Sequence, residues 1–295
     1  MCCGGRQEWV LMAKTIATIN LKGGVGKTTI TAGLAEFMSL EFGQRVLLID
    51  LDAQINLTTM MISEDHWLEL NKQGLTSATI FRDAVDGTSN FDLEASIQRG
   101  VSPVKRVTGV DLLPSSLDLI ELQEEISALR VADRNSTKPV ELLRDAVAPV
   151  MPYYDYVLID CPPNLGPITL NGLAMADGYV IPTIPDVLST YGIPQIQTHI
   201  AKFGKELGRE LFELGLVITK YKSNSAVHRT TVRNLRRDPN VPHVLPEYLA
   251  ESNQIAASAE FHPYSTLKVK YGNAGQFDQM RAITQNILTE AQAKL

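Results

Sequence analysis

The eight residues 22–29, Lys-Gly-Gly-Val-Gly-Lys-Thr-Thr, lie between a β-branched apolar run and a run with helical spacing. The preceding run, Thr15–Asn20, has the composition of a buried strand. The following run, 28–42, carries apolar residues at helical spacing and ends at Gly43. A second apolar strand, Arg45–Asp50, comes next. Strand, loop, helix and strand form a βαβ unit, which requires parallel strands and a right-handed crossover.

The rest of the chain continues this α/β pattern. Further apolar runs predict strands at Val110–Leu113, Tyr156–Asp160, Gly178–Pro182 and Leu214–Thr219. Helical spacing predicts helices at Ser116–Arg130, Lys138–Val150, Ile193–Leu207, Ala226–Arg237 and Gly275–Ala293. Residues 60–108 are more polar and predict short helices and loops at the edge of the sheet. We therefore expect a doubly wound, mostly parallel sheet with helices on both faces.

The glycine-rich loop has the chemistry of a phosphate-binding loop. Its glycines allow backbone N–H groups to surround phosphate oxygens, Lys27 supplies positive charge, and the Thr28 hydroxyl can ligate Mg²⁺. The loop differs from the strict G-x-x-x-x-G-K-[ST] pattern because Leu21 replaces the first glycine, and Lys22 stands at the loop entrance. The residues predicted to bind nucleotide are Gly23, Gly24, Val25, Gly26, Lys27, Thr28 and Thr29.

Three carboxylates follow predicted strands and are expected at the same edge of the sheet, where ligands bind in this architecture. Asp160 is predicted to hold the water shell of Mg²⁺, with Thr28 as a metal ligand and Asp50 supporting the metal side. Asp52 lies two residues past its strand and is predicted to orient the attacking water. The catalytic residues predicted from these positions are Lys27 and Asp52.

Composition limits the other possibilities. The net charge of −6 means that any nucleic-acid contact must come from a local basic patch. Three cysteines at positions 2, 3 and 161 have neither disulfide nor zinc spacing, which favours a reducing compartment. Residues 1–12 lack a signal peptide's features and are expected to be a disordered extension or to result from a misplaced start site. Residues 13–295 are predicted to form a single P-loop ATPase domain.

Three segments together resemble a known family. Residues 22–29, Asp50–Thr58 and Asp160–Pro163 are similar to the motifs of the ParA/Soj type of deviant Walker A partition ATPases. Within Asp50–Thr58, Ala53 stands where the family usually has proline. The likeness extends over most of residues 13–290 and indicates the short type, without an N-terminal helix-turn-helix.

The resemblance implies an ATP- and Mg²⁺-dependent homodimer with weak intrinsic ATP hydrolysis. Lys22 would reach across the dimer interface to the partner's phosphates, by the logic of an arginine finger. The dimer would bind double-stranded DNA non-specifically, and a ParB-like or other adaptor protein would stimulate hydrolysis and release it. The protein would then be cytoplasmic, associated with a bacterial or archaeal nucleoid, and would position a cargo that the sequence does not identify.

Basic residues near the C-terminal end supply candidate DNA contacts. Four arginines on the predicted helix 226–237 lie on one face at roughly i, i+4 and i+7/8 spacing. Two lysines lie where the family places basic DNA contacts. The predicted DNA-binding residues are Arg229, Arg233, Arg236, Arg237, Lys268 and Lys270. Lys220 and Pro246 are predicted to contact the nucleotide base.

Other readings of the motifs stay open at this stage. MinD-like membrane ATPases share the loop and Lys22, but they end in a basic amphipathic helix, whereas residues 281–295 carry two basic residues and no aromatics. Iron proteins need two separated cysteines, and Cys161 is alone and is expected to be a small buried residue. A metabolic ligase or kinase would need a motif for a second substrate. A scaffold that binds nucleotide without hydrolysing it is a further alternative.

Overall fold

A seven-stranded parallel sheet forms the centre of the computed structural model, which describes residues 13–132, 138–186, 190–241 and 243–295. The predicted extension, 1–12, lies outside these residues. The strand order is β3-β2-β4-β1-β5-β6-β7, and every pairing is parallel. The strands are β1 Lys14–Thr18, β2 Val46–Asp50, β3 Val110–Leu113, β4 Tyr156–Asp160, β5 Gly178–Thr183, β6 Phe212–Tyr221 and β7 Val244–Ala250. The predicted fold class is confirmed.

The strand order creates a crevice at the middle of the sheet. From β1 the chain passes to β2 and β3 on one side and later returns to place β4 between β2 and β1. It then builds β5, β6 and β7 on the other side of β1. Strand order therefore reverses next to β1, and ligands of doubly wound folds bind outside the carboxyl ends of strands at such a point.

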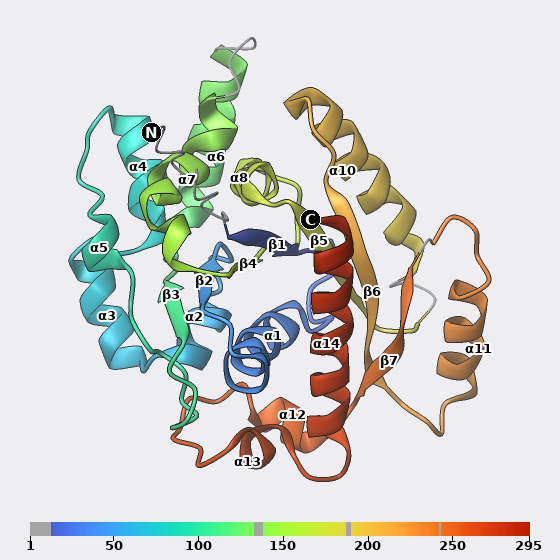
Figure 1. Ribbon diagram of the computed structural model, residues 1–295. Helices are drawn as coiled ribbons and strands as arrows, with labels where there is room; N and C mark the ends of the chain where they lie inside the picture. The colour runs from blue at the N-terminus through green and yellow to red at the C-terminus, as the bar shows by residue number, and fades with distance from the viewer. Residues whose placement is uncertain (1–12, 133–137, 187–189, 242) are drawn as a thin grey trace, which may run out of the picture.

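Helices cover both faces of the sheet (Figure 1). One apolar cluster joins the sheet to α1 Lys27–Phe42, α2 Asn56–Met61, α3 Glu64–Lys72, α13 Leu267–Tyr271 and α14 Gln276–Lys294. A second cluster joins the other face to α4 Ser77–Asp86, α6 Leu119–Ala132, α7 Lys138–Val147, α8 Pro167–Met175, α10 Ile193–Leu207 and α11 Ala226–Leu235. Neighbouring strand residues Ile16 and Ala17 belong to opposite clusters, as the two-residue period of a strand requires.

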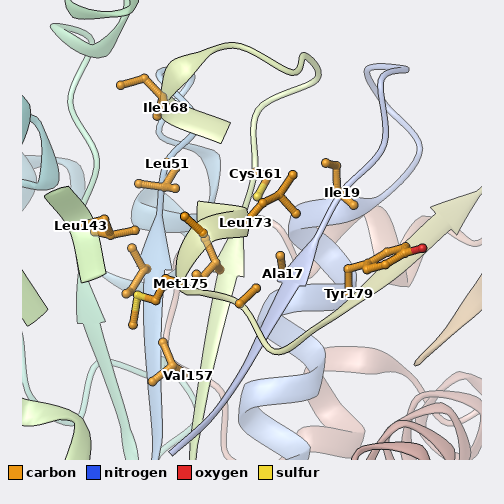
Figure 2. Packing of buried hydrophobic residues seen from close by; sticks show 14 of the residues in the cluster. Ala17, Ile19, Leu51, Leu143, Val157, Cys161, Ile168, Leu173, Met175 and Tyr179 are labelled. Carbon is orange, nitrogen blue, oxygen red and sulfur yellow. The ribbon is translucent and has the colours of Figure 1, made fainter. Parts of the chain in front are cut away.

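The second cluster packs closely under α8 (Figure 2). A Cβ atom on Gly172 would lie 3.0 Å from Leu51 Cδ1 and 3.4 Å from the Cys161 sulfur, so glycine lets α8 approach the sheet. Cys161 is fully buried, and this burial raises the pKa of its thiol well above the usual range. Cys161 is therefore a packing residue, as expected from its isolation in the sequence.

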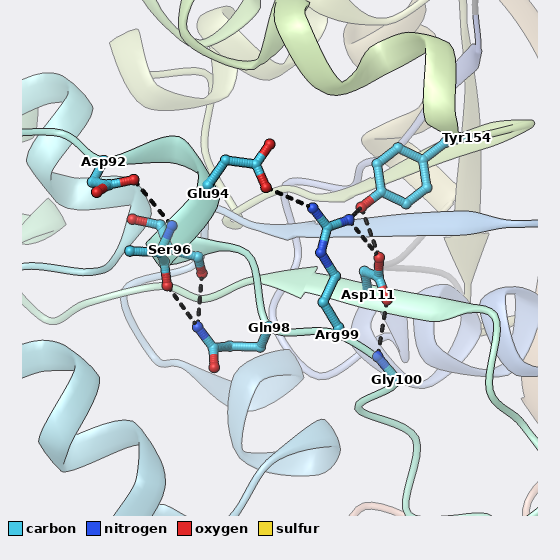
Figure 3. A network of polar contacts seen from close by, with 9 residues as sticks. Asp92, Glu94, Ser96, Gln98, Arg99, Gly100, Asp111 and Tyr154 are labelled. Atoms are coloured by element: carbon cyan, nitrogen blue, oxygen red, sulfur yellow. Dashed lines mark hydrogen bonds and ion pairs between the residues drawn. The ribbon is translucent and has the colours of Figure 1, made fainter.

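A polar network covers the edge strand β3 (Figure 3). The Arg99 guanidinium donates hydrogen bonds to Asp111 at 2.9 Å and to Tyr154 Oη at 2.6 Å, and Tyr154 Oη donates to Asp111 at 2.8 Å. Backbone hydrogen bonds of 2.8 Å in both directions join Gln98 to Leu112. These contacts pair part of an edge that would otherwise expose unpaired backbone groups. The segment around them includes the short helix α5 Leu93–Ser96.

The element predictions hold best for short apolar runs between turns. The bounds of β3, β4 and α10 agree with the prediction, whereas the predicted helix 138–150 ends at Val147 and continues as a 3-10 turn, Ala148–Tyr153. The strand β7 and the short helix α12 Asn253–Ala257 were not predicted. β7 contains Pro246, which an edge strand tolerates because a residue without a backbone N–H leaves no pairing unmade on the open side. The apolar and polar residues of β7 do not alternate with the two-residue period of a strand, so its sequence did not indicate a strand.

Candidate functional site

The loop between β1 and α1 takes the backbone shape that its glycines allow. Gly24 and Gly26 have φ values of 73° and 88°, in the left-handed region that favours glycine. Val25 is buried, and its carbonyl accepts a hydrogen bond of 2.6 Å from the Thr219 hydroxyl on β6. The loop is therefore fixed from β6 as well as by its own sequence, at the N-terminus of a sixteen-residue helix.

Lys22 lies at the loop entrance, beside β5. The buried Asn20 side chain donates to the Pro182 carbonyl at 2.8 Å and accepts from the Lys22 N–H at 2.9 Å. The Lys22 ammonium forms an ion pair of 3.2 Å with Asp186, and its side chain is 39% exposed. The Lys22 side chain thus contacts its own chain at this edge while remaining partly open to solvent.

Thr28 and Asp160 are brought together at the start of α1. The Thr28 hydroxyl donates a hydrogen bond of 2.7 Å to Asp160 Oδ2, and Lys27 is buried beside them with 6% of its surface exposed. Asp50 is the register neighbour of Asp160 on the adjoining strand. The Asp50 carboxylate accepts hydrogen bonds from Asp52 N, Thr58 N and the Thr58 hydroxyl at 3.0, 2.9 and 2.7 Å.

Burial disfavours ionisation of the two carboxyls at the strand ends. Burial and the neighbouring Asp160 carboxylate raise the pKa of Asp50 well above its usual range, although hydrogen bonds from Thr58 oppose the rise. Burial also raises the pKa of Asp160, against the hydrogen bond from Thr28 and the Lys27 ammonium. A divalent cation beside Thr28 and Asp160 would stabilise both ionised forms. Mg²⁺ typically takes one or two carboxylates plus phosphate oxygens, so the donor set fits it.

Asp52 lies at the wall of an open cavity of about 270 Å³. Its carboxylate accepts a hydrogen bond of 3.0 Å from Gln54 N, and its carbonyl accepts one of 2.9 Å from the Ser115 hydroxyl. The cavity is lined by the residues Gly23, Gly24, Gly26, Lys27, Thr28, Thr29, Asp52, Gln54, Asn56, Thr59, Met60, Pro163, Lys220 and Ala259. The structure thus brings together most of the residues predicted to bind nucleotide, with Asp52 opposite the loop.

A second cavity of about 220 Å³ adjoins the first and shares Gly26, Thr29, Lys220 and Ala259 with it. Its lining is mostly apolar and includes Leu249, Ile255 and Ala256 from β7 and α12. Lys220 lies in the left-handed region with φ 47°, at the end of β6. No local pattern in the sequence indicated the α12 residues, because their position depends on how β7 and α12 fold back.

Pro246 is placed apart from both cavities. It is an exposed residue of β7, and its carbonyl accepts a hydrogen bond of 2.7 Å from Arg236. It lines neither of the two cavities beside the loop. We therefore do not assign Pro246 to base binding.

Two of the four arginines predicted to bind DNA lie on α11, Ala226–Leu235, and the other two directly follow its end, which comes two residues before the predicted one. Arg229, Arg233, Arg236 and Arg237 are all exposed, and α11 packs through Val232 and Leu235. The Arg229 and Arg236 guanidiniums donate to backbone carbonyls, whereas the Arg233 and Arg237 side chains have no hydrogen-bond or ion-pair partner within the part of the chain that the structure describes. Lys268 is exposed on α13, with its ammonium 5.2 Å from the centre of the Phe277 ring.

The DNA-contact prediction for Lys270 is wrong. Its side chain is fully buried, and its ammonium forms an ion pair of 2.8 Å with the equally buried Glu36 carboxylate on α1. An ammonium in this position cannot reach a phosphate in solution. The neighbouring basic residue Lys268 had suggested an exposed basic segment, but the helical turn directs the two side chains to different environments.

The raised carboxyl pKa values predict how stability depends on pH without nucleotide or metal. Because folding raises the pKa of Asp50 to about 8 and that of Asp160 to about 7, the folded state binds more protons than the unfolded state between about pH 4 and about pH 8, and over this range these groups make stability fall as pH rises. Thermal unfolding at roughly pH 5 and roughly pH 7, both inside that window, should show this fall. Asp160→Asn removes one of the two carboxyls and should make the fall in stability between these pH values smaller. An equally steep fall in the variant would contradict the assignment.

Comparisons with known proteins find a matching family model, related sequences and a similar fold. A family model described as an AAA domain matches residues 13–212. An uncharacterized protein of Mycobacterium tuberculosis is 38% identical over 209 residues, which are 71% of this chain and 58% of that protein. The chain thus matches less than two thirds of that relative's length. The sporulation initiation inhibitor protein Soj of Bacillus subtilis is 32% identical over 212 residues, which are 70% of this chain and 73% of Soj.

A solved structure has the same fold. It is cobyrinic acid a,c-diamide synthase from Mycobacterium smegmatis with a bound ATP analogue and magnesium, and it matches with a TM-score of 0.72 at 25% identity, covering 94% of each chain. The family model covers more than half of this chain, and Soj is matched over more than two thirds of its length. The chain therefore belongs to the AAA-domain ATPases of the ParA/Soj partition family.

Proposed function

We propose that this protein is an ATP-hydrolysing positioning protein that segregates a plasmid, a chromosome or another cargo. ATP and Mg²⁺ would drive formation of a homodimer that binds DNA non-specifically in the cytoplasm, on the nucleoid. A ParB-like or other adaptor protein would stimulate hydrolysis and so release the dimer. The observation that carries the proposal is the group formed by Lys27, Thr28 and Asp160 at the N-terminus of α1.

The roles of the residues follow from their positions. The loop N–H groups from Gly23 to Thr29 and the Lys27 ammonium would bind the phosphates. Thr28 would ligate Mg²⁺, and Asp160 and Asp50 would hold it and its water shell. When bound there, the metal would neutralise charge on the phosphates. Asp52 lines the same cavity and would orient the attacking water. The apolar second cavity, with Lys220 at its border, would take the adenine base.

Lys22 would complete the site of a second copy. Its partly exposed ammonium lies at the entrance of the loop rather than inside it, where Lys27 already supplies a positive charge. On dimerisation Lys22 would exchange Asp186 for the partner's phosphates. A cation supplied in trans lowers the barrier to phosphoryl transfer only when the dimer is assembled.

The membrane-bound alternative gains no support from the C-terminal helix. α14 buries Met280, Ile283, Ile287 and Leu288 against α1 and the sheet, so its apolar face is occupied. An amphipathic helix that binds lipid needs that face free. Among the described residues, no helix is both long and apolar enough to cross a membrane.

The central test is ATP turnover measured with and without double-stranded DNA and Mg²⁺, alongside the oligomeric state by size-exclusion chromatography. We expect slow turnover that requires Mg²⁺, a dimer that forms only with ATP, and DNA binding that requires the dimer. A protein that binds ATP but shows no turnover under any condition would instead be the nucleotide-binding scaffold. Failure to bind ATP would exclude the proposal altogether.

The α11 arginines provide a prediction for DNA binding. The double variant Arg233→Ala/Arg237→Ala should weaken DNA binding by about tenfold or more at low salt, and each lost phosphate contact should reduce the salt slope by about 1. The charge-matched control is Lys202→Ala/Lys205→Ala on α10, which also removes two exposed positive charges. Fluorescence anisotropy with random-sequence DNA at several salt concentrations measures both quantities. Equal losses in the two variants would assign the effect to net charge rather than to α11.

A further inference from the structure

We propose that a fully buried ion pair between Glu36 and Lys270 positions helix α12 and thereby sets the affinity for the base of the nucleotide. This inference rests on the proposed function, because it assigns the apolar cavity beside the loop to the base. It concerns residues that touch neither the phosphates nor the proposed metal site. They would act as positioning residues, through the wall of the cavity.

The ion pair is enclosed, and both carboxylate oxygens of Glu36 accept further hydrogen bonds. The Glu36 and Lys270 side chains are both 0% exposed, with 2.8 Å between the Lys270 ammonium and Glu36 Oε1. Glu36 Oε1 also accepts a hydrogen bond of 2.6 Å from the Ser102 hydroxyl, and Glu36 Oε2 accepts one of 2.7 Å from the Tyr271 hydroxyl. Buried charges are costly unless such additional hydrogen bonds accompany them, and an ion pair satisfied in this way favours one geometry.

The ion pair ties α13 to the helix that begins at the phosphate loop. Glu36 lies nine residues after Lys27 on α1, or about 13 Å along the helix axis at 1.5 Å per residue. The Phe37 and Tyr271 rings add an edge-to-face contact with centroids 5.4 Å apart. These contacts hold α13 against α1, the helix that directly follows the phosphate-binding loop.

Gln254 then ties α12 to α13. Its side-chain amide donates hydrogen bonds of 2.9 Å to the Val269 carbonyl and 3.0 Å to the Lys270 carbonyl. Gly272 permits this approach, because a Cβ atom there would lie 2.9 Å from Gln254 Cγ. A second link comes from the Tyr264 hydroxyl, which donates to the Ala257 carbonyl at 3.2 Å.

α12 depends on these links because it is short and has no buried residue of its own. A helix of five residues is not stable by itself. Its other side supplies Ile255 and Ala256 to the apolar cavity. The phosphate end of the site is built from the loop, α1 and β4, which do not need α12. Loosening α12 should therefore weaken binding of the base and leave binding of the phosphates unchanged.

The test compares two ligands, MgATP and magnesium tripolyphosphate, which lacks base and sugar. Calorimetric dissociation constants are measured for the wild type, Gln254→Met, which removes the donor at similar size, and the control Gln285→Met on the exposed side of α14. We expect Gln254→Met to weaken MgATP binding about five- to tenfold, as the loss of one or two hydrogen bonds implies, with tripolyphosphate affinity unchanged. The double variant Glu36→Gln/Lys270→Met, which leaves no unpaired buried charge, should show the same selective loss.

The outcomes separate this inference from the proposed function. Equal weakening of both ligands, or no change in either, would overturn the positioning role while ATP binding by the wild type still supports the function. Failure of the wild type to bind MgATP would count against both. If the double variant does not fold, Gln254→Met alone decides, because Gln254 is exposed and its replacement leaves the core intact.

Discussion

Lys22→Ala is expected to bind MgATP as a monomer and to remain a monomer. The loop, Lys27 and Thr28 stay in place, so the phosphates of one protomer are still bound. The charge that would reach the partner's phosphates is lost, and dimerisation and hydrolysis should fail together. A cation supplied in trans typically contributes a factor of about 10³ to 10⁵ to the rate of phosphoryl transfer, so turnover should fall below detection.

Two further variants show whether the effect belongs to the trans contact. Asp186→Asn removes the negative charge of one intrachain partner of Lys22 and leaves the lysine charge in place, so the variant should still dimerise with ATP. Lys72→Ala removes a different exposed lysine and controls for net charge. Size-exclusion chromatography with light scattering, with and without MgATP, gives the oligomeric state. Normal ATP-dependent dimers of Lys22→Ala would exclude the role assigned to this lysine.

Asp52→Asn is expected to separate assembly from hydrolysis. The amide oxygen can still accept the hydrogen bond from Gln54 N, so the loop should keep its shape. The amide cannot take up a proton from water, and loss of such a group costs about 10² to 10⁴ in rate. The variant should therefore form long-lived ATP dimers that stay on DNA and retain the adaptor.

Single-turnover hydrolysis with bound radiolabelled ATP measures this rate directly, and MgATP affinity is measured in parallel. Asp65→Asn, on an exposed part of α3, makes the same chemical change away from the site. Wild-type turnover in Asp52→Asn would assign water activation to another group. A parallel loss of ATP affinity would show that Asp52 acts in binding rather than in the chemical step.

Local sequence signals determined the part of the site that binds phosphate. Gly24 and Gly26 adopt the backbone conformations that glycine favours, and Asp50 and Asp160 end neighbouring parallel strands, as their apolar runs predicted. These features depend on residues close together in the chain and on the regular geometry of a βαβ unit. The structure adds the burial of Asp50 and Asp160, and thereby the raised pKa of both carboxyls.

Other parts of the site depend on contacts between distant residues. Lys270 belongs to a basic segment that predicted a DNA contact, but its partner Glu36 lies 234 residues away on α1. The apolar cavity is formed where β7 and α12 meet the loop, and neither element has a periodic pattern of its own. Pro246 was predicted to contact the base, but it is an exposed residue of the edge strand β7 and lines neither cavity.

The sequence by itself thus determined the parallel α/β architecture, the phosphate loop and the carboxylates that face it, because short-range patterns and strand ends specify them. Only the tertiary structure decided which lysines are buried and which are exposed, and where an apolar cavity lies. Burial and cavity shape arise from side chains that meet across the whole chain, so no window of neighbouring residues contains them. For this protein, the sequence identified the phosphate chemistry, and the packing of α12 and α13 against α1 defined the surroundings of the proposed base site.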